Sequence, residues 1–117
     1  MCYVLGKYKS SKKAQKKVRF GCAALPLSNS RILLIGGKRD FSSKSYLSTT
    51  EIVDLASGMS TLGPEMSCPR YCCSDVILHD GRMLVIGGRS SFESSLSTTE
   101  VIGLTSGTSS PGPTMNT

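Results

Sequence analysis

Two stretches of the sequence, 51 residues apart, share one pattern. Residues 31–37 read RILLIGG, and residues 82–88 read RMLVIGG. In both stretches an apolar run leads without interruption into a double glycine. A short continuous apolar run bounded by glycine is typical of a strand that is buried on both faces. The pattern therefore predicts the same buried strand and tight turn twice in one chain.

The surroundings of these two stretches repeat as well. Residues 47–51 and 96–100 both read LSTTE, at an offset of 49 residues, and a Gly-Pro-x-Met step follows each copy. The offset changes by two residues between the double glycine and the LSTTE run, where a loop is expected. Repeated units tolerate such a change in a loop. We therefore divide the chain into a leader (residues 1–18), a first repeat (19–69) and a second repeat (70–117).

Each repeat reads as four short strands, without helical periodicity. In the first repeat the expected strands cover residues 20–27, 31–35, 50–55 and 59–62. In the second repeat they cover residues 71–78, 82–86, 99–104 and 108–110. Turn-forming residues separate the first two strands of both copies, and Gly-Pro ends each unit. Short strands at even spacing predict an all-β fold.

The order of these landmarks resembles the kelch repeat. The marks are the Arg that opens a unit, the double glycine and the Glu of the third strand: Arg19, Gly36, Gly37 and Glu51, then Arg70, Gly87, Gly88 and Glu100. The Tyr and Trp that the family usually carries in the third and fourth strands are replaced by Val53 and Ser60, and by Ile102 and Ser109. This departure implies looser packing between blades.

The resemblance implies two four-stranded antiparallel blades of a kelch-type β-propeller. Two blades form a partial ring, because propellers have about four to eight blades. We therefore expect that the chain is part of a longer protein or that it associates with copies of itself to complete a ring. We expect the glycines to be structural, because no helix or Lys-Ser/Thr follows them to complete a phosphate site. Glu51 is predicted to pair with Arg19 or Arg70, and Glu100 with Arg70 or with the Arg of a next repeat that this sequence does not contain.

The resemblance also indicates where a partner would bind. In kelch proteins the residues just past the double glycine and around the opening Arg commonly line a binding face, and here these are Lys38, Arg39, Arg70, Tyr71 and Arg89. Cations beside an aromatic ring suit an acidic peptide motif. We therefore expect a non-catalytic protein–protein interaction module. Two alternatives stay open: a fragment of a kelch-like propeller oxidase, and a degenerate remnant without function.

Charge and cysteine content narrow the remaining classes. Residues 7–19 carry seven Lys and Arg and no acid, so the net charge of +6 belongs to the leader, which we expect to be disordered. Only Tyr8 interleaves with these cations, which disfavours nucleic acid, and no apolar stretch is long enough to span a membrane. Five cysteines without a paired spacing, and a single His, predict reduced thiols, no metal and no cofactor. These features favour a cytoplasmic location, with the nucleus open because of the basic leader.

Overall fold

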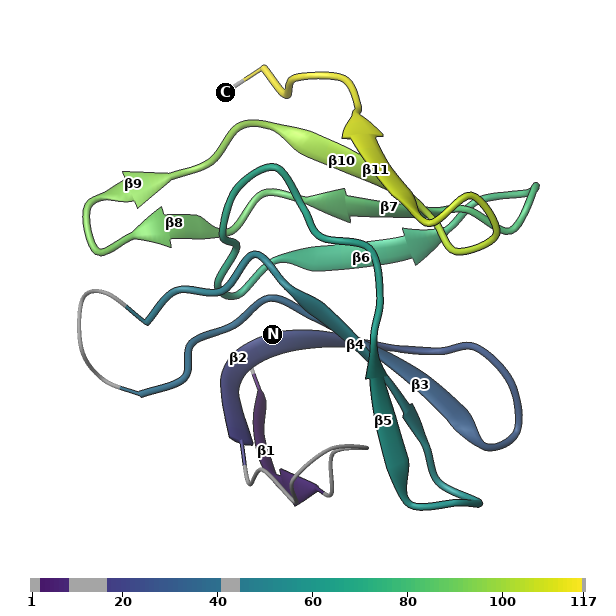
Figure 1. Cartoon of the computed structure of the whole chain (residues 1–117). Coiled ribbons are helices and arrows are strands. Elements are labelled where there is room, and N and C mark those ends of the chain that lie inside the picture. Colours follow the sequence, from purple (N-terminus) through teal and green to yellow (C-terminus); the bar gives the residue numbers. More distant parts are fainter. Residues whose placement is uncertain (1–2, 9–16, 41–44, 117) are drawn as a thin grey trace.

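The computed structural model describes residues 3–8, 17–40 and 45–116, and all of its regular elements are β-strands. Blade 1 is a sheet of order β1-β2-β3-β4-β5, and blade 2 is a sheet of order β11-β10-β7-β6 (Figure 1). The strands of blade 1 are β1 (Tyr3–Tyr8), β2 (Lys17–Pro26), β3 (Arg31–Ile35), β4 (Thr50–Asp54) and β5 (Met59–Leu62). Those of blade 2 are β6 (Ser74–Ile77), β7 (Met83–Ile86), β10 (Thr99–Gly103) and β11 (Thr108–Pro111).

A short ribbon extends blade 2. Strands β8 (Arg89–Ser91) and β9 (Ser94–Ser95) pair with each other in the loop between β7 and β10, and the repeat pattern did not predict them. The eight predicted strands all form, and β3 and β5 have the predicted bounds. Among the described residues, none forms a helix of the length and apolarity that a membrane span needs.

The leader differs from the prediction of disorder over residues 1–18. Tyr3–Tyr8 forms β1, which pairs antiparallel with β2, and β2 already begins at Lys17. Leu5 lies opposite Arg19 in this pairing. The physical reason is the free edge of β2, whose unpaired N–H and C=O groups attract an apolar extended segment. Residues 9–16, which hold most of the lysines of the leader, lie outside the described residues.

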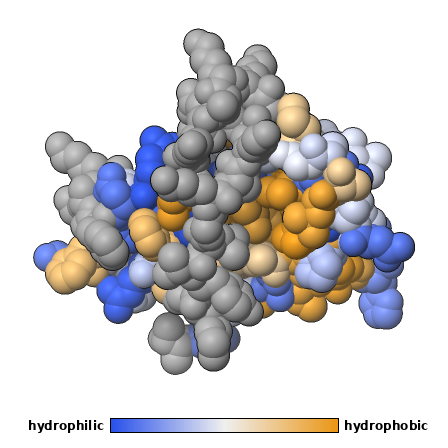
Figure 2. All heavy atoms as spheres, turned by 90° about the horizontal axis from the view of Figure 1, so that it is seen from below, coloured by the Kyte–Doolittle hydropathy of each residue, from blue (hydrophilic) through white to orange (hydrophobic). Residues whose placement is uncertain are grey.

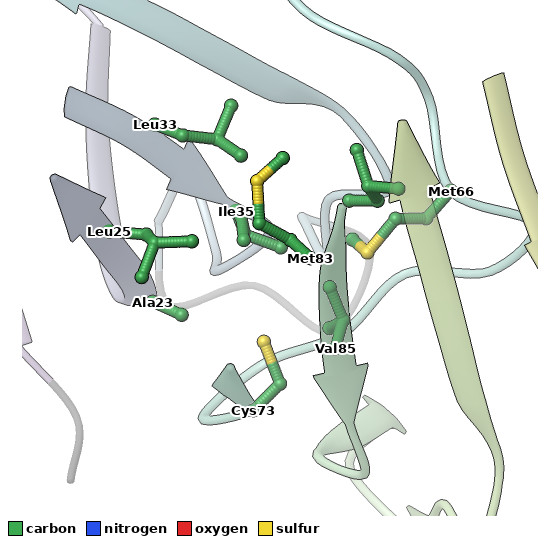
Figure 3. Close-up of a cluster of buried hydrophobic side chains, with 9 residues drawn as sticks. Ala23, Leu25, Leu33, Ile35, Met66, Cys73, Met83 and Val85 are labelled. Atoms are coloured by element: carbon green, nitrogen blue, oxygen red, sulfur yellow. The ribbon is translucent and has the colours of Figure 1, made fainter. Parts of the chain in front are cut away.

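The hydrophobic core lies between the two blades. Leu33 and Ile35 of β3 are fully buried and pack in one cluster with Met83 and Val85 of β7. Figure 3 shows these side chains converging from the two sheets, with Leu25 beside them. Successive residues of a strand point to opposite faces, so each blade uses a different set of residues toward each neighbour. Blade 1 thus contributes the face that carries Leu33 and Ile35 to the core. Blade 2 contributes the face that carries Met83 and Val85, which lies on the other side of its sheet from the residues equivalent to Leu33 and Ile35.

Backbone hydrogen bonds connect the blades at the double glycine. The N–H of Gly37 donates to the carbonyl of Arg70 (2.8 Å), and the N–H of Arg70 donates to the carbonyl of Leu47 (3.1 Å). A Cβ atom at Gly36 would overlap the carbonyl oxygen of Arg70, and Gly36 has a φ of 65°. Only glycine tolerates both the close approach and this backbone conformation. The first double glycine is therefore a docking point for the start of the next blade.

The cysteines depart in part from the expectation of reduced thiols. Cys72 is disulfide-bonded, whereas Cys22, Cys68 and Cys73 are free. Burial raises the pKa of the Cys22 thiol, and burial with the nearby Asp75 carboxylate raises that of Cys73 to about 11. Both buried thiols therefore stay protonated at neutral pH, and they act as small apolar residues of the core.

Candidate functional site

Arg70, predicted to contact a partner, is instead buried and fully engaged. Its side chain is 1% exposed and donates four hydrogen bonds. Nε donates to Glu100 Oε2 (3.1 Å), Nη1 donates to the carbonyls of Gly87 and Thr98, and Nη2 donates to the Thr98 hydroxyl (3.0 Å). Four of the five guanidinium N–H groups are hydrogen-bonded within blade 2 and the side chain is buried away from a partner, so the prediction of a binding role for Arg70 was wrong. The repeat predicted both a binding role for Arg70 and its pairing with Glu100, and the structure shows the pairing.

Blade 1 holds the same arrangement. Arg19 Nε donates to Glu51 Oε1 (2.8 Å), Nη1 donates to the carbonyls of Gly36 and Thr49, and Nη2 donates to the Thr49 hydroxyl. Both pairings are among those that the repeat predicted. A buried charge is tolerated when it is paired and hydrogen-bonded. The two Arg–Glu pairs are thus structural, and each ties the loop after the double glycine to the third strand of its own blade.

The serines at the positions of the missing Trp complete these networks. The hydroxyl of Ser109 donates to Glu100 Oε1 (2.7 Å), and that of Ser60 donates to Glu51 Oε2 (3.3 Å). Burial alone would raise the pKa of Glu100, but hydrogen bonds from Ser109, the Ser67 N–H and Arg70 outweigh it and lower the pKa. Glu100 is therefore ionised at neutral pH and serves as the counter-ion of Arg70.

The other cations that were predicted to bind a partner, Lys38, Arg39 and Arg89, gather at one end of the blades. Both loops that follow a double glycine project from the same end, at the left of Figure 1. Lys38 Nζ lies 4.7 Å from the centre of the Tyr46 ring and 5.7 Å from that of the Tyr71 ring. The two rings meet edge to face, with their centres 5.8 Å apart. Lys38 and Tyr71 were predicted to lie together, whereas Tyr46 was missed because only the loop geometry brings it there.

Two further predicted cations, Arg39 and Arg89, flank this group and are exposed. The backbone N–H of Arg89 donates to the carbonyl of Tyr71 (2.9 Å), and its guanidinium donates to the carbonyl of Phe92. Phe92 is 74% exposed, the most exposed of the large hydrophobic residues in the described part of the chain. We call the set of these six residues the loop-end cluster: Lys38, Arg39, Tyr46, Tyr71, Arg89 and Phe92.

The loop-end cluster consists of cations and aromatic rings, and the same loops also carry the carboxylates of Asp40 and Glu93. Within residues 3–8, 17–40 and 45–116, no three His, Cys, Asp or Glu side chains lie close enough together to hold a metal ion. His79, the chain's one histidine, is an exposed turn residue between β6 and β7. The chemistry present at this end suits recognition of an anionic or aromatic surface.

Comparison with known proteins agrees with this architecture. Residues 70–116 match the model of the Kelch motif. A search of curated proteins found no match. Among solved structures, the chain resembles a fungal alcohol oxidase of the AA5 family in complex with copper, with a TM-score of 0.72 and 16% identity. The match covers 84% of this chain and 23% of the oxidase chain, so the chain spans about a quarter of that protein's length.

At this identity the likeness to the oxidase concerns the fold alone. The second blade is the part that matches the family model, and blade 1 repeats its strands, its Arg–Glu pair and its double glycine. Residues 70–116 therefore carry a kelch motif, and the two sheets have the fold of antiparallel blades of a kelch-type β-propeller.

Proposed function

We propose that the chain is a non-catalytic binding module that recognises an acidic segment of a protein partner through the loop-end cluster. The observation that carries the proposal is the Lys38 ammonium group beside the Tyr46 and Tyr71 rings, with Arg39 and Arg89 exposed nearby. Aromatic residues and Arg are enriched at the centres of protein interfaces. Arg side chains also bind carboxylates through paired hydrogen bonds.

The structure favours an acidic peptide with an apolar or aromatic side chain. Lys38 and Arg89 supply positive charge on two neighbouring loops, while Phe92 offers exposed apolar surface between charged residues. An exposed ion pair alone contributes only about 0–1 kcal/mol, so charge by itself would give weak binding. Stacking on Tyr46 and Tyr71 adds the apolar contact that a specific interface needs.

The test uses fluorescent peptides rich in Glu and Phe, with matched peptides in which Lys replaces Glu. Binding is measured by fluorescence anisotropy for the native chain and for the variants Lys38→Glu and Arg89→Glu, singly and combined. Two control variants are measured in the same way. The controls, Arg31→Glu and Arg82→Glu, reverse exposed charges at the opposite end of the same blades. We expect the double loop-end variant to bind roughly tenfold to hundredfold more weakly, since each lost contact contributes about 1 kcal/mol. Equal losses in both pairs of variants would refute the proposed site.

The second candidate function is that the chain is a fragment of a kelch-like propeller oxidase. This hypothesis rests on the fold that the chain shares with the copper-containing fungal enzyme. The residues of this chain do not fit a copper site of their own. The chain has a single histidine, and no group of three ligand side chains lies together in the part that the structure describes. Copper analysis of the purified chain after incubation with the metal tests this reading. Stoichiometric, tightly held copper would support it against the binding module.

A further inference from the structure

Blade 2 has an open face that repeats the buried face of blade 1. We call this set of four residues the open face: Val76, Leu84, Ile86 and Val101. Val76 and Val101 both lie opposite Leu84 in the sheet, so their side chains share one face with it. The equivalent residues of blade 1 belong to or pack against the core between the blades: Leu25, Leu33, Ile35 and Ile52.

The exposure of equivalent residues measures what covers each face. Leu33 is fully buried against blade 2, whereas its equivalent Leu84 is partly exposed. Leu25 is 8% exposed, and its equivalent Val76 is 44% exposed. Ile35 is likewise fully buried while its equivalent Ile86 is partly exposed, whereas Ile52 and Val101 are both partly exposed. The open face therefore has the composition of a blade–blade contact.

The backbone around the second double glycine gives an independent observation. In blade 1, the Gly37 N–H and the Leu47 carbonyl bind the backbone of one extended residue, Arg70. The equivalent groups in blade 2 are the N–H of Gly88 and the carbonyl of Leu96, and neither forms a hydrogen bond within the described residues. These two groups are set to receive the N–H and C=O of a single extended residue.

The matching half of such a contact is present on blade 1 of the same chain. Ile32, Leu34 and Val53 hold the positions that Met83, Val85 and Ile102 hold on the core-facing side of blade 2. Ile32 and Val53 are partly exposed, whereas Leu34 is 4% exposed in the single chain. Figure 2 views the molecule from below blade 1, and hydrophobic residues form a patch on this side beside the residues drawn in grey. Each chain thus has one half of the contact at either end.

The residue that would replace Arg70 in that contact is Arg19, which already forms the equivalent buried pair with Glu51. The backbone groups of Phe20 face Lys38 within blade 1, so those of Arg19 point to the other edge of β2. That edge pairs with β1, where Leu5 lies opposite Arg19. Strand β1 therefore occupies the backbone that a preceding blade would bind.

We propose that the open face of blade 2 docks onto the face of blade 1 that carries Ile32, Leu34 and Val53 in a second copy. The two copies contact each other head to tail, and β1 competes with this contact. Arg19 of the second copy then takes the place that Arg70 takes within one chain. A head-to-tail contact closes into a ring when its rotation allows closure. Because propellers have about four to eight blades, closed rings of this chain contain two to four copies.

The experiment measures mass by light scattering and sedimentation over a wide range of concentrations of the full chain. We expect the native chain to shift from one copy to a closed species of two to four copies as its concentration rises. Leu5→Pro removes the N–H of the residue opposite Arg19 and weakens β1, so assembly should begin at roughly tenfold lower concentration. Val101→Glu places a charge on the open face and should hold the chain as a single copy, also when combined with Leu5→Pro.

The control is Thr105→Glu, which adds the same charge in an exposed turn of blade 2 and should assemble as the native chain does. If Val101→Glu loses its strand signal in circular dichroism, Ser110→Glu replaces it, since Ser110 is exposed and lies opposite Val101. A single copy at every concentration for both the native chain and Leu5→Pro would overturn the proposal. Equal assembly of the open-face variant and Thr105→Glu would overturn it as well.

Discussion

Replacing Glu100 by Gln tests whether the buried Arg–Glu pair holds blade 2 to the chain. Glu100 is 2% exposed and accepts hydrogen bonds from Arg70, the Ser109 hydroxyl and the Ser67 N–H. Gln keeps the size of the side chain but removes the charge that neutralises Arg70. Leaving one partner of a buried ion pair without its counter-charge costs about 3–5 kcal/mol. Small domains have about 5–15 kcal/mol of stability, so the variant should be close to unfolding.

The pH dependence of the same variant gives a second, independent measurement. The pKa of Glu100 is lower in the folded chain than in the unfolded chain, so its contribution is complete above the ordinary Glu pKa. That contribution is lost as the pH falls through the lowered folded value. Gln cannot titrate, and therefore the stability difference between the native chain and Glu100→Gln should shrink toward acid pH.

The assay is urea unfolding followed by circular dichroism at several pH values. Glu65→Gln is the matched control, because Glu65 is exposed and bonds only the Ser48 hydroxyl among the described contacts. Surface substitutions of this kind change stability by less than about 0.5 kcal/mol. Similar losses of unfolding free energy for Glu100→Gln and Glu65→Gln would refute the assignment of Glu100 as the counter-ion that stabilises blade 2. A stability difference between the native chain and Glu100→Gln that stays constant with pH would refute it as well.

Five further substitutions test the remaining features by thermal or urea unfolding. Asp75→Ala should stabilise the chain at neutral pH by roughly 0.5–1 kcal/mol, because one carboxylate oxygen is buried without a partner and the side chain is only half-buried. Burial raises the pKa of Asp75, so the folded chain binds this proton more tightly and the gain should vanish in acid; a gain at all pH values would exclude this cause. Gly36→Ala should cost more than about 2 kcal/mol and Gly58→Ala about 1 kcal/mol, since both have positive φ but only Gly36 meets a neighbouring backbone. Leu33→Ala should cost about 2–5 kcal/mol and Leu84→Ala less than half as much; equal costs would contradict the difference in their burial.

The repeat allowed most of the fold to be predicted from the sequence. A continuous apolar run next to a double glycine identifies β3 and β7, and the spacing of Glu and Arg in two copies indicates which charges pair. Repetition separates structural residues from chance, because each copy provides a control for the other. The serines that replace Trp show the limit of this reasoning, since their bonds to Glu depend on side-chain geometry that a pattern does not contain.

Features that occur once could not be predicted in the same way. Strand β1 depends on a free edge of β2, and an edge exists only after the sheet has formed. The ribbon of β8 and β9 is too short to produce an alternating pattern. Tyr46 lies in a serine-rich loop, and its contact with Lys38 follows from how that loop folds back across the blade.

The division between repeated and unrepeated residues also bears on the proposed function. The Arg–Glu pairs, the double glycines and the threonines that bond Pro64 and Pro113 are the same in both blades, so they describe how a blade is built. The loops after the double glycines differ in length and in side chains, and they carry Lys38 with Tyr46 in one blade and Arg89 with Phe92 in the other. A scaffold held by buried pairs leaves these loops free to vary without loss of the fold. Residues that differ between two otherwise equal blades are therefore the ones that the proposed binding module would use to distinguish one partner from another.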